Sequence, residues 1–465
     1  MSDSSLAAGA GRRLTQDGDS SVRHLGQARL IALSAYWVSI GYLWQALGTL
    51  VIPFLIERFV GVAHQGLALS VLEGIGTLLA VIWQPLCGMW SDGFSSRYGR
   101  RYPFMFVGTA SDLVFLFFMA LAGAFWWLAV AYLLLQASSN SAQAPYQGLL
   151  PDVVPEDERA QASGYYGVAN LVGILTGTVV AGIVLGKAGV GASLFTCGAV
   201  LVIGLVITAA WIREPQHMER REKRSPASDF FIPLRNRPFF LLTLSRLFIL
   251  MGIVGIQSFT LFFFTDAFFP HDASRAISST YTLVGLVVFV ALLVTWPAAR
   301  LSDITGRRPM IVASGLVSAA GNIGLIFSHS VLMIPAFLLD PAARILHVPD
   351  FAAQAAFMGL FIGLGFGAFL SVDWVFLMDY VPAEKAALFM AFSNVATAGS
   401  GIVARFAGGF LLDFGDAHGK VFALPAGYPL IFAVFAAWMV IGSLVIAFIP
   451  EGRANPRKMA PSVPG

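Results

Sequence analysis

Long apolar runs separated by short polar turns form the dominant pattern of this chain. Each run is long enough to cross roughly 30 Å of hydrocarbon as an α-helix. The runs fall at 29–55, 66–90, 102–123, 125–150, 159–186, 190–212, 239–265, 276–300, 308–328, 354–379, 385–412 and 424–449. This pattern predicts an all-α membrane protein with twelve transmembrane helices. An even number of crossings places both termini on the same side.

Polar segments divide the chain into two halves of six apolar runs each. Residues 1–26 contain no apolar core, so we expect a disordered tail there rather than a cleaved signal peptide. Residues 213–238 are polar and basic and predict a central loop between six-helix bundles at 27–212 and 239–449. Residues 450–465 predict a second tail.

The positive charges are distributed unevenly between the two predicted sides. Of 29 Lys and Arg residues, 22 fall on the side of the termini, five fall on the opposite side, and Arg246 and Arg405 lie within runs. Positive loops are retained in the cytoplasm. We therefore expect a multi-pass protein of the cell (inner or plasma) membrane, with both termini cytoplasmic. On the opposite side, Val331–Leu339 is interpreted as a short interfacial helix in the 329–353 loop.

Composition supports the membrane assignment and argues against several other classes. Charged residues make up 12% of the chain and mean hydropathy is +0.75, whereas a soluble chain carries about twice that charged fraction. The net charge of +3 is spread over loops and indicates no nucleic-acid partner. Cys87 and Cys197 lie in apolar runs, so they predict neither a disulfide framework nor a metal site. We find no nucleophile–base constellation and no phosphate loop, so we expect no enzyme and no cofactor.

A charged turn occurs twice between apolar runs. Residues 88–104 read GMWSDGFSSRYGRRYPF, and residues 300–309 read RLSDITGRRP. Asp92 follows its own helix, where the helix dipole disfavours an anion, so it needs a basic partner or the N-terminus of another helix. If that partner lies on a helix that moves, the contact would stabilise one conformation of the protein. The alternative is that these charges only set the orientation of the chain in the membrane. The expected gate residues are Gly88, Asp92, Arg97, Gly99, Arg100, Arg101, Asp303, Gly306, Arg307 and Arg308, together with Asp152 and Asp379.

The two Asp…Gly-Arg-Arg turns carry a family resemblance. They resemble the loop between helices 2 and 3 of the major facilitator superfamily. The longer first copy is similar to the glycoside–pentoside–hexuronide branch, which holds melibiose-type cation symporters and sucrose-type proton symporters. A second repeat, Asp152-Val-Val-Pro155-Glu156 and Asp379-Tyr-Val-Pro382-Ala-Glu384, supports two related halves. The resemblance implies two pseudo-symmetric six-helix bundles that work by alternating access.

A stripe of amides marks the fourth run. Gln136, Asn140, Gln143 and Gln147 recur at i, i+4, i+7 and i+11 and share one helix face. Amides offer both donors and acceptors, which suits sugar hydroxyls better than ions. The alternative is hydrogen bonding between helices. We predict that this stripe binds substrate.

The resemblance also indicates where this chain departs from its relatives. Sucrose-type symporters carry an Asp and an Arg on the fourth helix, and the alignment puts Gln136 and Gln147 at those positions. The melibiose-type Asp falls near Gln143. The charges are missing here, which argues against the sucrose-type proton mechanism. Further expected substrate contacts are Trp37, Trp44, Gln45 and Asn394.

Charges inside hydrocarbon cost about 2.5–3.5 kcal/mol each on insertion scales, so the few present need an explanation. Arg246 and Asp373 lie at the same predicted depth, and the helices that carry them line the cavity in the superfamily. We predict that they pair, either as a static structural pair or as part of the coupling device. The expected coupling residues are Glu73, Arg246, Asp373 and Arg405. Asp112, on a peripheral helix, is interpreted as a satisfied structural group.

These features favour a secondary active transporter, a proton-coupled sugar symporter that acts as a monomer in the lipid bilayer. One alternative is a facilitator-type transporter or exporter of a non-sugar solute. A second alternative, from another class, is a non-transporting assembly factor or receptor.

Overall fold

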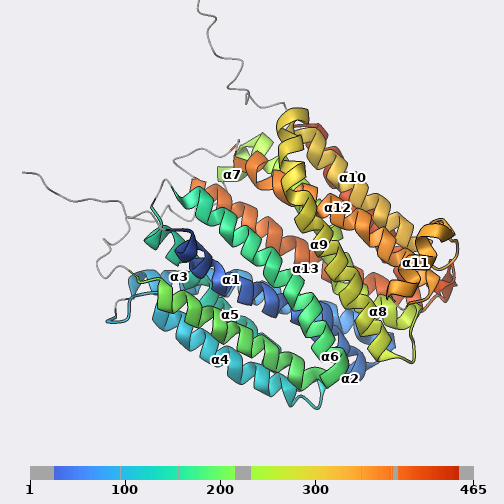
Figure 1. Cartoon of the computed structure of the whole chain (residues 1–465), viewed down its shortest axis with the longest axis horizontal. Coiled ribbons are helices and arrows are strands. Elements are labelled where there is room, and N and C mark those ends of the chain that lie inside the picture. Colours follow the sequence, from blue (N-terminus) through green and yellow to red (C-terminus); the bar gives the residue numbers. More distant parts are fainter. Residues whose placement is uncertain are drawn as a thin grey trace, which may run out of the picture.

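The computed structural model describes residues 26–94, 96–155, 158–214, 232–346, 348–378, 380 and 386–449. Both expected tails, most of the central loop and Asp379 lie outside this part of the chain. Apart from one short hairpin, the regular structure of the described residues is helical, as Figure 1 shows.

The first half forms one bundle. Its elements are α1 (Gln27–Ala46), η1 (Leu47–Val51), α2 (Ile52–Val60), η2 (Val62–His64), α3 (Gln65–Gly93), α4 (Tyr102–Ala120), α5 (Phe125–Val153) and α6 (Arg159–Trp211). The residues of α6 form the fifth and sixth predicted crossings, two helical segments that meet at Gly189. Gly189 interrupts α6 with φ 82° and ψ −177°, a conformation that glycine adopts without the steric cost of a Cβ. The chain therefore reverses at Gly189 and not at a polar loop.

The second half forms the other bundle. Its helices are α7 (Ile232–Arg235), α8 (Arg237–Ala267), α9 (Ala273–Thr305), α10 (Arg307–Ile326), α11 (Ala336–Leu346), α12 (Asp350–Met378), α13 (Ala386–Asp416) and α14 (Gly427–Ala447). Strands β1 (Lys420–Val421) and β2 (Leu424–Pro425) pair as an antiparallel hairpin between α13 and α14.

The short helix α11 corrects the boundary expected from the apolar pattern. We expected a helix at Val331–Leu339, but it begins at Ala336 and ends at Leu346. Pro335 immediately precedes its first residue, and proline lacks the N–H that a preceding helical turn would use. The helix therefore starts after the proline and continues into a more polar sequence.

Nine helical segments among the described residues are long and apolar enough to cross a membrane. One of them, Gly164–Trp211, contains two of the predicted crossings on either side of Gly189. The two remaining predicted crossings correspond to α5 and α13. The arrangement is the predicted all-α membrane fold of twelve crossings in two bundles.

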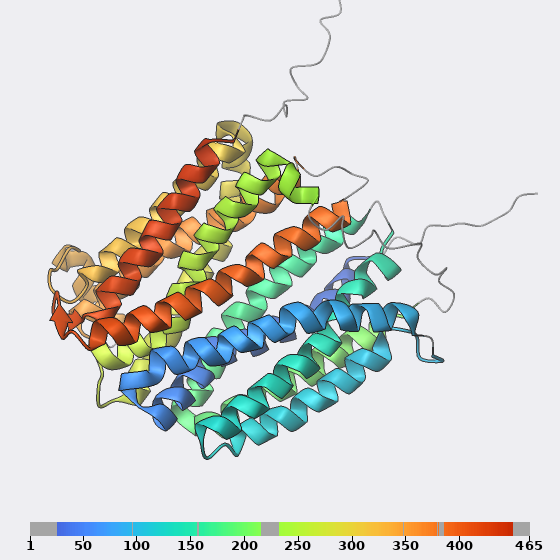
Figure 2. The same ribbon diagram turned by 180° about the vertical axis from the view of Figure 1, so that it is seen from behind.

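The two bundles meet along α3 with α13 and along α6 with α9. Figure 2 shows α13 running beside α3. A Cβ on Gly409 of α13 would overlap Ser70 Oγ and the Gly66 carbonyl oxygen of α3, so this crossing depends on small residues.

The bundle-to-bundle contacts lie toward one end of the molecule. We call this the closed end, and we call the opposite end, which carries the two Gly-Arg-Arg turns, the basic end. Gly182 approaches Tyr281 in the halves of α6 and α9 near the closed end. Gly66 approaches Asp413 at the start of α3 and the end of α13. The structure is therefore sealed between bundles at the closed end.

Candidate functional site

A π-helical turn shapes the wall of the site in the first crossing. The Ile52 N–H donates to the Leu47 carbonyl five residues back. Pro53 has no N–H, so the Thr49 carbonyl lacks its usual i+4 donor and the helix widens. Such turns recur at functional sites in proteins. Here the turn places Gly48 and Thr49 on the wall of a cavity.

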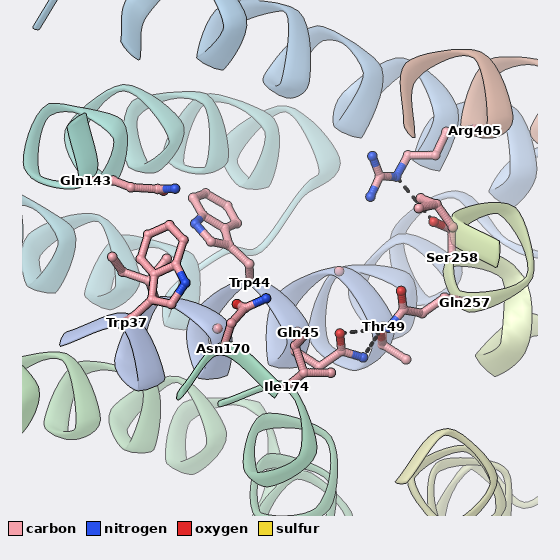
Figure 3. A pocket seen from close by; sticks show the side chains of 14 residues that line it. Trp37, Trp44, Gln45, Thr49, Gln143, Asn170, Ile174, Gln257, Ser258 and Arg405 are labelled. Atoms are coloured by element: carbon pink, nitrogen blue, oxygen red, sulfur yellow. Dashed lines mark hydrogen bonds between the residues drawn. The ribbon is translucent and has the colours of Figure 1, made fainter. Parts of the chain in front are cut away.

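That cavity lies between the two bundles and has a volume of about 280 Å³. Elements of both bundles contribute to it: α1, η1, α5 and α6 from the first, and α8 and α13 from the second (Figure 3). Its aromatic and polar lining consists of Trp37, Trp44, Gln45, Thr49, Gln143, Asn170, Gln257, Ser258 and Arg405. Of the expected substrate contacts, Trp37, Trp44, Gln45 and Gln143 therefore line it.

The ring of Trp37 is held in place from behind. It stacks on Tyr166 with ring centroids 5.9 Å apart and an interplanar angle of 22°. Tyr146 stacks on Tyr166 at 5.4 Å and donates a 2.6 Å hydrogen bond to the Leu33 carbonyl. The cavity consequently has a preformed aromatic face, which can pack on the C–H groups of a ring-shaped solute.

A chain of amide hydrogen bonds crosses from one bundle to the other. Gln257 of α8 donates from Nε2 to Gln45 Oε1 of α1 at 2.8 Å. Gln45 in turn donates to Thr49 Oγ1 at 2.7 Å. All three side chains line the cavity, and Figure 3 shows the two bonds as dashed lines. Because the Gln257–Gln45 bond joins the two bundles, the arrangement of this polar wall depends on how the bundles are positioned.

An ion pair also joins the bundles at the cavity. Glu73 of α3 is only 2% exposed and contacts Arg405 Nε of α13. The Arg405 side chain is 19% exposed and lines the cavity. Arg405 also donates from Nε to Ser258 Oγ at 3.2 Å and from Nη1 to Thr77 Oγ1 at 3.4 Å. The sequence singled out both charged residues but did not predict that they contact each other.

The amide stripe is only partly in the cavity. Gln143 lines it, but Gln136 and Asn140 are buried elsewhere. Gln136 donates to Tyr132 Oη at 2.8 Å, and Asn140 donates to the Gln136 carbonyl at 2.8 Å. Gln147 is exposed and accepts a 3.4 Å hydrogen bond from Gln84.

This corrects the expectation that the whole stripe binds substrate. A shared helix face does not fix which neighbour that face meets, and α5 packs on α3 at Gln136. Gln136, Asn140 and Gln147 therefore lie outside the cavity in this conformation. Asn394 lies in α13, but its side chain is outside the described residues.

Four polar residues of the cavity were not predicted from the sequence as site residues: Thr49, Asn170, Gln257 and Ser258. Gln257 and Ser258 are adjacent polar residues in an otherwise apolar stretch of α8, and that interruption is the signal that could have found them. Asn170 follows the Asp152 repeat, and its carbonyl lies close to Gly41 of α1. No group of three or more His, Cys, Asp or Glu side chains suited to a metal ion occurs among the described residues.

The Arg246–Asp373 pair predicted from equal depth is present. Arg246 Nη1 lies 2.5 Å from Asp373 Oδ2, and the residues are 4% and 2% exposed. Arg246 Nε also donates to Thr397 Oγ1 at 3.1 Å. Both members belong to the second bundle, and neither lines the cavity. Asp112, interpreted as a structural group, is buried and accepts a hydrogen bond from Ser138.

The first charged turn at the basic end forms a network within its own bundle. Arg101 Nη2 lies 2.6 Å from Asp92 Oδ1, and Arg101 Nε lies 3.0 Å from Asp152 Oδ2. Arg100 Nη2 lies 2.7 Å from the same Asp152 oxygen. Glu214 accepts from the backbone N–H groups of Arg100 and Arg101 at 3.0–3.1 Å.

Other members of this turn have different roles. Gly99 has φ +96°, which permits the reversal. The Arg97 guanidinium lies over the Tyr98 ring at 4.6 Å and has no carboxylate partner among the described residues. A Cβ added at Gly88 would lie 3.9 Å from the Ala144 Cβ, an ordinary contact, so this position does not require glycine for space.

The second charged turn is built differently. Gly306 repeats the positive φ of +96°, but Asp303 is exposed and forms no ion pair with any described residue. Arg308 Nη1 donates to the Ile449 carbonyl just beyond α14, and Arg307 Nη1 donates to the Val375 carbonyl, each at 3.2 Å. The two similar turns therefore make different contacts. The arginines of the first turn bind carboxylates, whereas those of the second turn donate to backbone carbonyl groups.

A carboxylate of the second bundle binds the first bundle at the closed end. Asp413, near the end of α13, accepts from the N–H groups of Gly66 at 3.0 Å and Leu67 at 2.9 Å, at the start of α3. Anions are stabilised at helix N-termini by these unpaired donors and by the helix dipole. Beside it, Gln65 donates to Asp266 at 2.6 Å. The signal that drew attention to Asp92, a carboxylate at a helix C-terminus, applies equally to Asp413.

Comparison with known families gives one long match. The model of the Major Facilitator Superfamily matches residues 29–404. Similar solved structures include the nucleoside transporter NupG, with a TM-score of 0.65, 13% identity and coverage of 91% of this chain and 99% of that one. Another is a bacterial homologue of the human lysosomal transporter Spinster, inward-facing and occupied, with a TM-score of 0.66, 16% identity and coverage of 90% and 96%.

Similar curated proteins are distant. The sucrose transport protein SUC3 of Arabidopsis thaliana is 22% identical over 187 residues, covering 35% of this chain and 31% of the relative. The class E tetracycline resistance protein of Escherichia coli is 31% identical over 134 residues, covering 28% and 31%. The sucrose transport protein SUC4 of Arabidopsis thaliana is 26% identical over 171 residues, covering 32% and 33%. The chain therefore spans about a third of the length of these relatives.

Proposed function

Because the chain belongs to the Major Facilitator Superfamily, we propose that it is a proton-coupled symporter of a small hydroxyl-rich solute of the sugar class. One observation carries the proposal: a cavity between the bundles is lined by Arg405, whose partner Glu73 is a buried carboxylate of the opposite bundle. This arrangement joins a titratable group, a solute site and the bundle interface in a single contact.

The lining supports the choice of solute. Amides at Gln45, Gln143 and Gln257 supply both donors and acceptors for hydroxyl groups. Trp37 and Trp44 supply flat apolar faces. The volume of about 280 Å³ is close to the lower end of the range of about 300–1,000 Å³ for small-molecule pockets. The sucrose relatives agree with this class, whereas the tetracycline relative supports an alternative, the export of a non-sugar solute.

The coupling proposal rests on the cost of isolated charges. As an ion pair, Glu73 and Arg405 neutralise each other and attract the two bundles. A proton on Glu73 removes that attraction, which frees α3 to move from α13. A buried pair that loses one charge is strongly destabilised, so a proton at this site changes the balance between conformations.

Alternating access then follows from the two ends of the molecule. The contacts of Asp413 with α3 and of Gly409 with Gly66 hold the closed end together. The Lys and Arg distribution supports an orientation in which the basic end and both termini face the cytoplasm, and we propose the inner or plasma membrane of the cell as the location. In that orientation the conformation is inward-facing, and we propose the Asp92–Arg101 network as the gate that reorganises when the basic end closes. We propose a monomer as the working unit.

The solute site is tested by a matched pair of amides. Gln143→Leu should weaken solute binding because a buried hydroxyl loses its partner, at a cost of about 1–3 kcal/mol, or about five- to 150-fold in affinity. Gln147→Leu, on the same helix but exposed outside the cavity, is the control and should bind as wild type. The measurement is binding and counterflow of a labelled panel in proteoliposomes, containing neutral sugars, sugar acids and tetracycline. Transport of tetracycline, with neither binding nor transport of any sugar or sugar acid, would contradict the proposed function and would support the alternative, export of a non-sugar solute.

The closed end is tested by removing one charge. Asp413→Asn keeps the shape of the side chain but weakens the cap on α3, which is worth about 0.5–2 kcal/mol. The fraction of molecules in which the two bundles are separated at the closed end should rise about two- to thirty-fold. This fraction is measured from the distance between spin labels at the exposed positions Val62 and Val421. Asp272→Asn is the control, because Asp272 caps the start of its own helix α9 and bridges no bundles. Equal distance distributions in both variants would show that Asp413 does not hold the closed end together.

A further inference from the structure

We infer that the transported solute carries one negative charge, a carboxylate on a hydroxylated body, and that Arg405 binds it when Glu73 is protonated. This inference rests on the proposed function and names the substrate class of the same site. Arg405 is the one charged residue among the described residues that line the cavity. Its terminal nitrogens point into the open space in Figure 3.

The hydrogen bonds of Arg405 leave an edge of the guanidinium available. Its contacts with Glu73 and Ser258 use Nε, and its 3.4 Å bond to Thr77 uses Nη1. Nη2 makes no hydrogen bond to any described residue. A guanidinium presents five N–H donors in a planar fork that matches a carboxylate with two parallel bonds. A solute carboxylate therefore finds a geometrically suited donor edge on the cavity side.

The electrical balance of the site requires the proton and the anion to bind together. When Glu73 is ionised, its negative charge balances the positive charge of Arg405, so the pair is neutral. An added carboxylate would leave one excess negative charge next to Glu73, which is only 2% exposed. A proton on Glu73 alone would leave Arg405 without a counter-ion. Adding both keeps the site neutral, so each ligand favours the binding of the other.

A neutral sugar does not satisfy this balance. Its hydroxyl groups can bond the amides of the cavity, but they supply no counter-ion for Arg405 once Glu73 is protonated. The groups that face Glu73 from other elements are Arg405 of α13, Tyr132 of α5 and Gly48 of η1. Of these only Arg405 is charged, so the exchange of partners occurs at this guanidinium. The proton comes from the aqueous phase and returns to it, and no covalent bond of the solute changes.

The test compares matched pairs that differ in one carboxylate: glucuronate with glucose, galacturonate with galactose, and gluconate with glucitol. Binding to the purified full-length protein is measured between pH 5 and pH 8, and uptake is measured in proteoliposomes. In each pair that is recognised, we expect the acid to bind at least tenfold more tightly than its neutral partner at pH 5. We also expect the binding of the acid to weaken by up to tenfold per pH unit, with one proton taken up per solute.

Two variants test the assigned roles. Glu73→Gln should bind the acid tightly and without pH dependence, because the neutral amide imitates the protonated carboxyl. Arg405→Gln should remove the preference for the acid, so that the two members of a pair bind alike. The pH dependence of the wild-type protein provides a readout if either variant fails to fold.

The alternatives are distinguishable. Proton-coupled uptake of the neutral members, with acids bound no better, would overturn this inference and leave the proposed function standing. Absence of binding and uptake across all pairs would overturn both. A preference for acids that survives Arg405→Gln would place the anion site elsewhere.

Discussion

Replacing Glu73 by glutamine is expected to abolish accumulation driven by a pH gradient while leaving solute exchange intact. Glu73 is buried, lies on α3 and contacts Arg405 across the bundle interface. Glutamine has nearly the same shape but cannot release a proton, so the variant remains fixed in the protonated form. The solute can still enter and leave, but its movement no longer requires a proton.

The effect is large enough to measure directly. A symporter that carries one proton per solute with no net charge reaches an accumulation ratio of about tenfold per pH unit, because 1.36 kcal/mol corresponds to a factor of ten. Glu73→Gln should give a ratio of about one, with exchange of labelled for unlabelled solute continuing at a rate within severalfold of wild type. Asp112→Asn is the control, since Asp112 is a buried carboxyl that does not line the cavity. Gradient-driven accumulation by Glu73→Gln would move the coupling site to another residue.

The second large effect concerns Arg246 and Asp373. Removal of either charge should destabilise the folded protein strongly, because a single buried charge without its partner costs about 3–5 kcal/mol. The two residues lie 2.5 Å apart within one bundle and outside the cavity. We therefore favour the static structural pair over a coupling role. The double variant Arg246→Gln with Asp373→Asn should recover most of the lost stability and should accumulate solute.

Thermal unfolding in detergent and gradient-driven uptake provide the two readouts. A structural pair predicts low yield and a lowered melting temperature in both single variants, and recovery of both readouts in the double variant. If the double variant regains stability and exchanges solute but does not accumulate it, the pair takes part in coupling and the structural assignment is wrong.

The order of elements could be predicted from the apolar pattern because hydrocarbon thickness fixes the length of each crossing. The reversal at Gly189 agrees with the predicted separation of 159–186 from 190–212, since these two segments lie on either side of it in α6. The Arg246–Asp373 contact could be predicted because the two residues share a predicted depth and because buried charges need partners.

The Glu73–Arg405 contact could not be predicted from the sequence, because it depends on how the two bundles are placed relative to each other. The sequence named both residues as expected coupling residues, but they belong to different bundles. Whether α3 meets α13 depends on which conformation the two bundles adopt, and no local pattern encodes that. The same limit explains Asp413, whose donors lie at the start of a helix almost 350 residues earlier in the chain.

The amide stripe shows the opposite error. Spacing correctly indicates that Gln136 and Gln143 share a broad helix face, but it gives no information about the neighbour that each side chain meets. Gln136 meets its own helix and α3, whereas Gln143, two turns further along, meets the cavity. A periodic polar face predicts that polar partners exist, and only the packing decides whether they are protein groups or a solute.

The most direct measurement of the central claim is proton movement during solute entry. Purified protein in liposomes containing a pH-sensitive dye would receive the transported solute on one side, with no gradient imposed beforehand. The account predicts that the lumen becomes acidic as the solute enters, with one proton per solute, and that Glu73→Gln transports by exchange without any acidification. Solute entry by the wild-type protein with no change in lumenal pH, or with acidification that persists in Glu73→Gln, would contradict coupling through the Glu73–Arg405 pair.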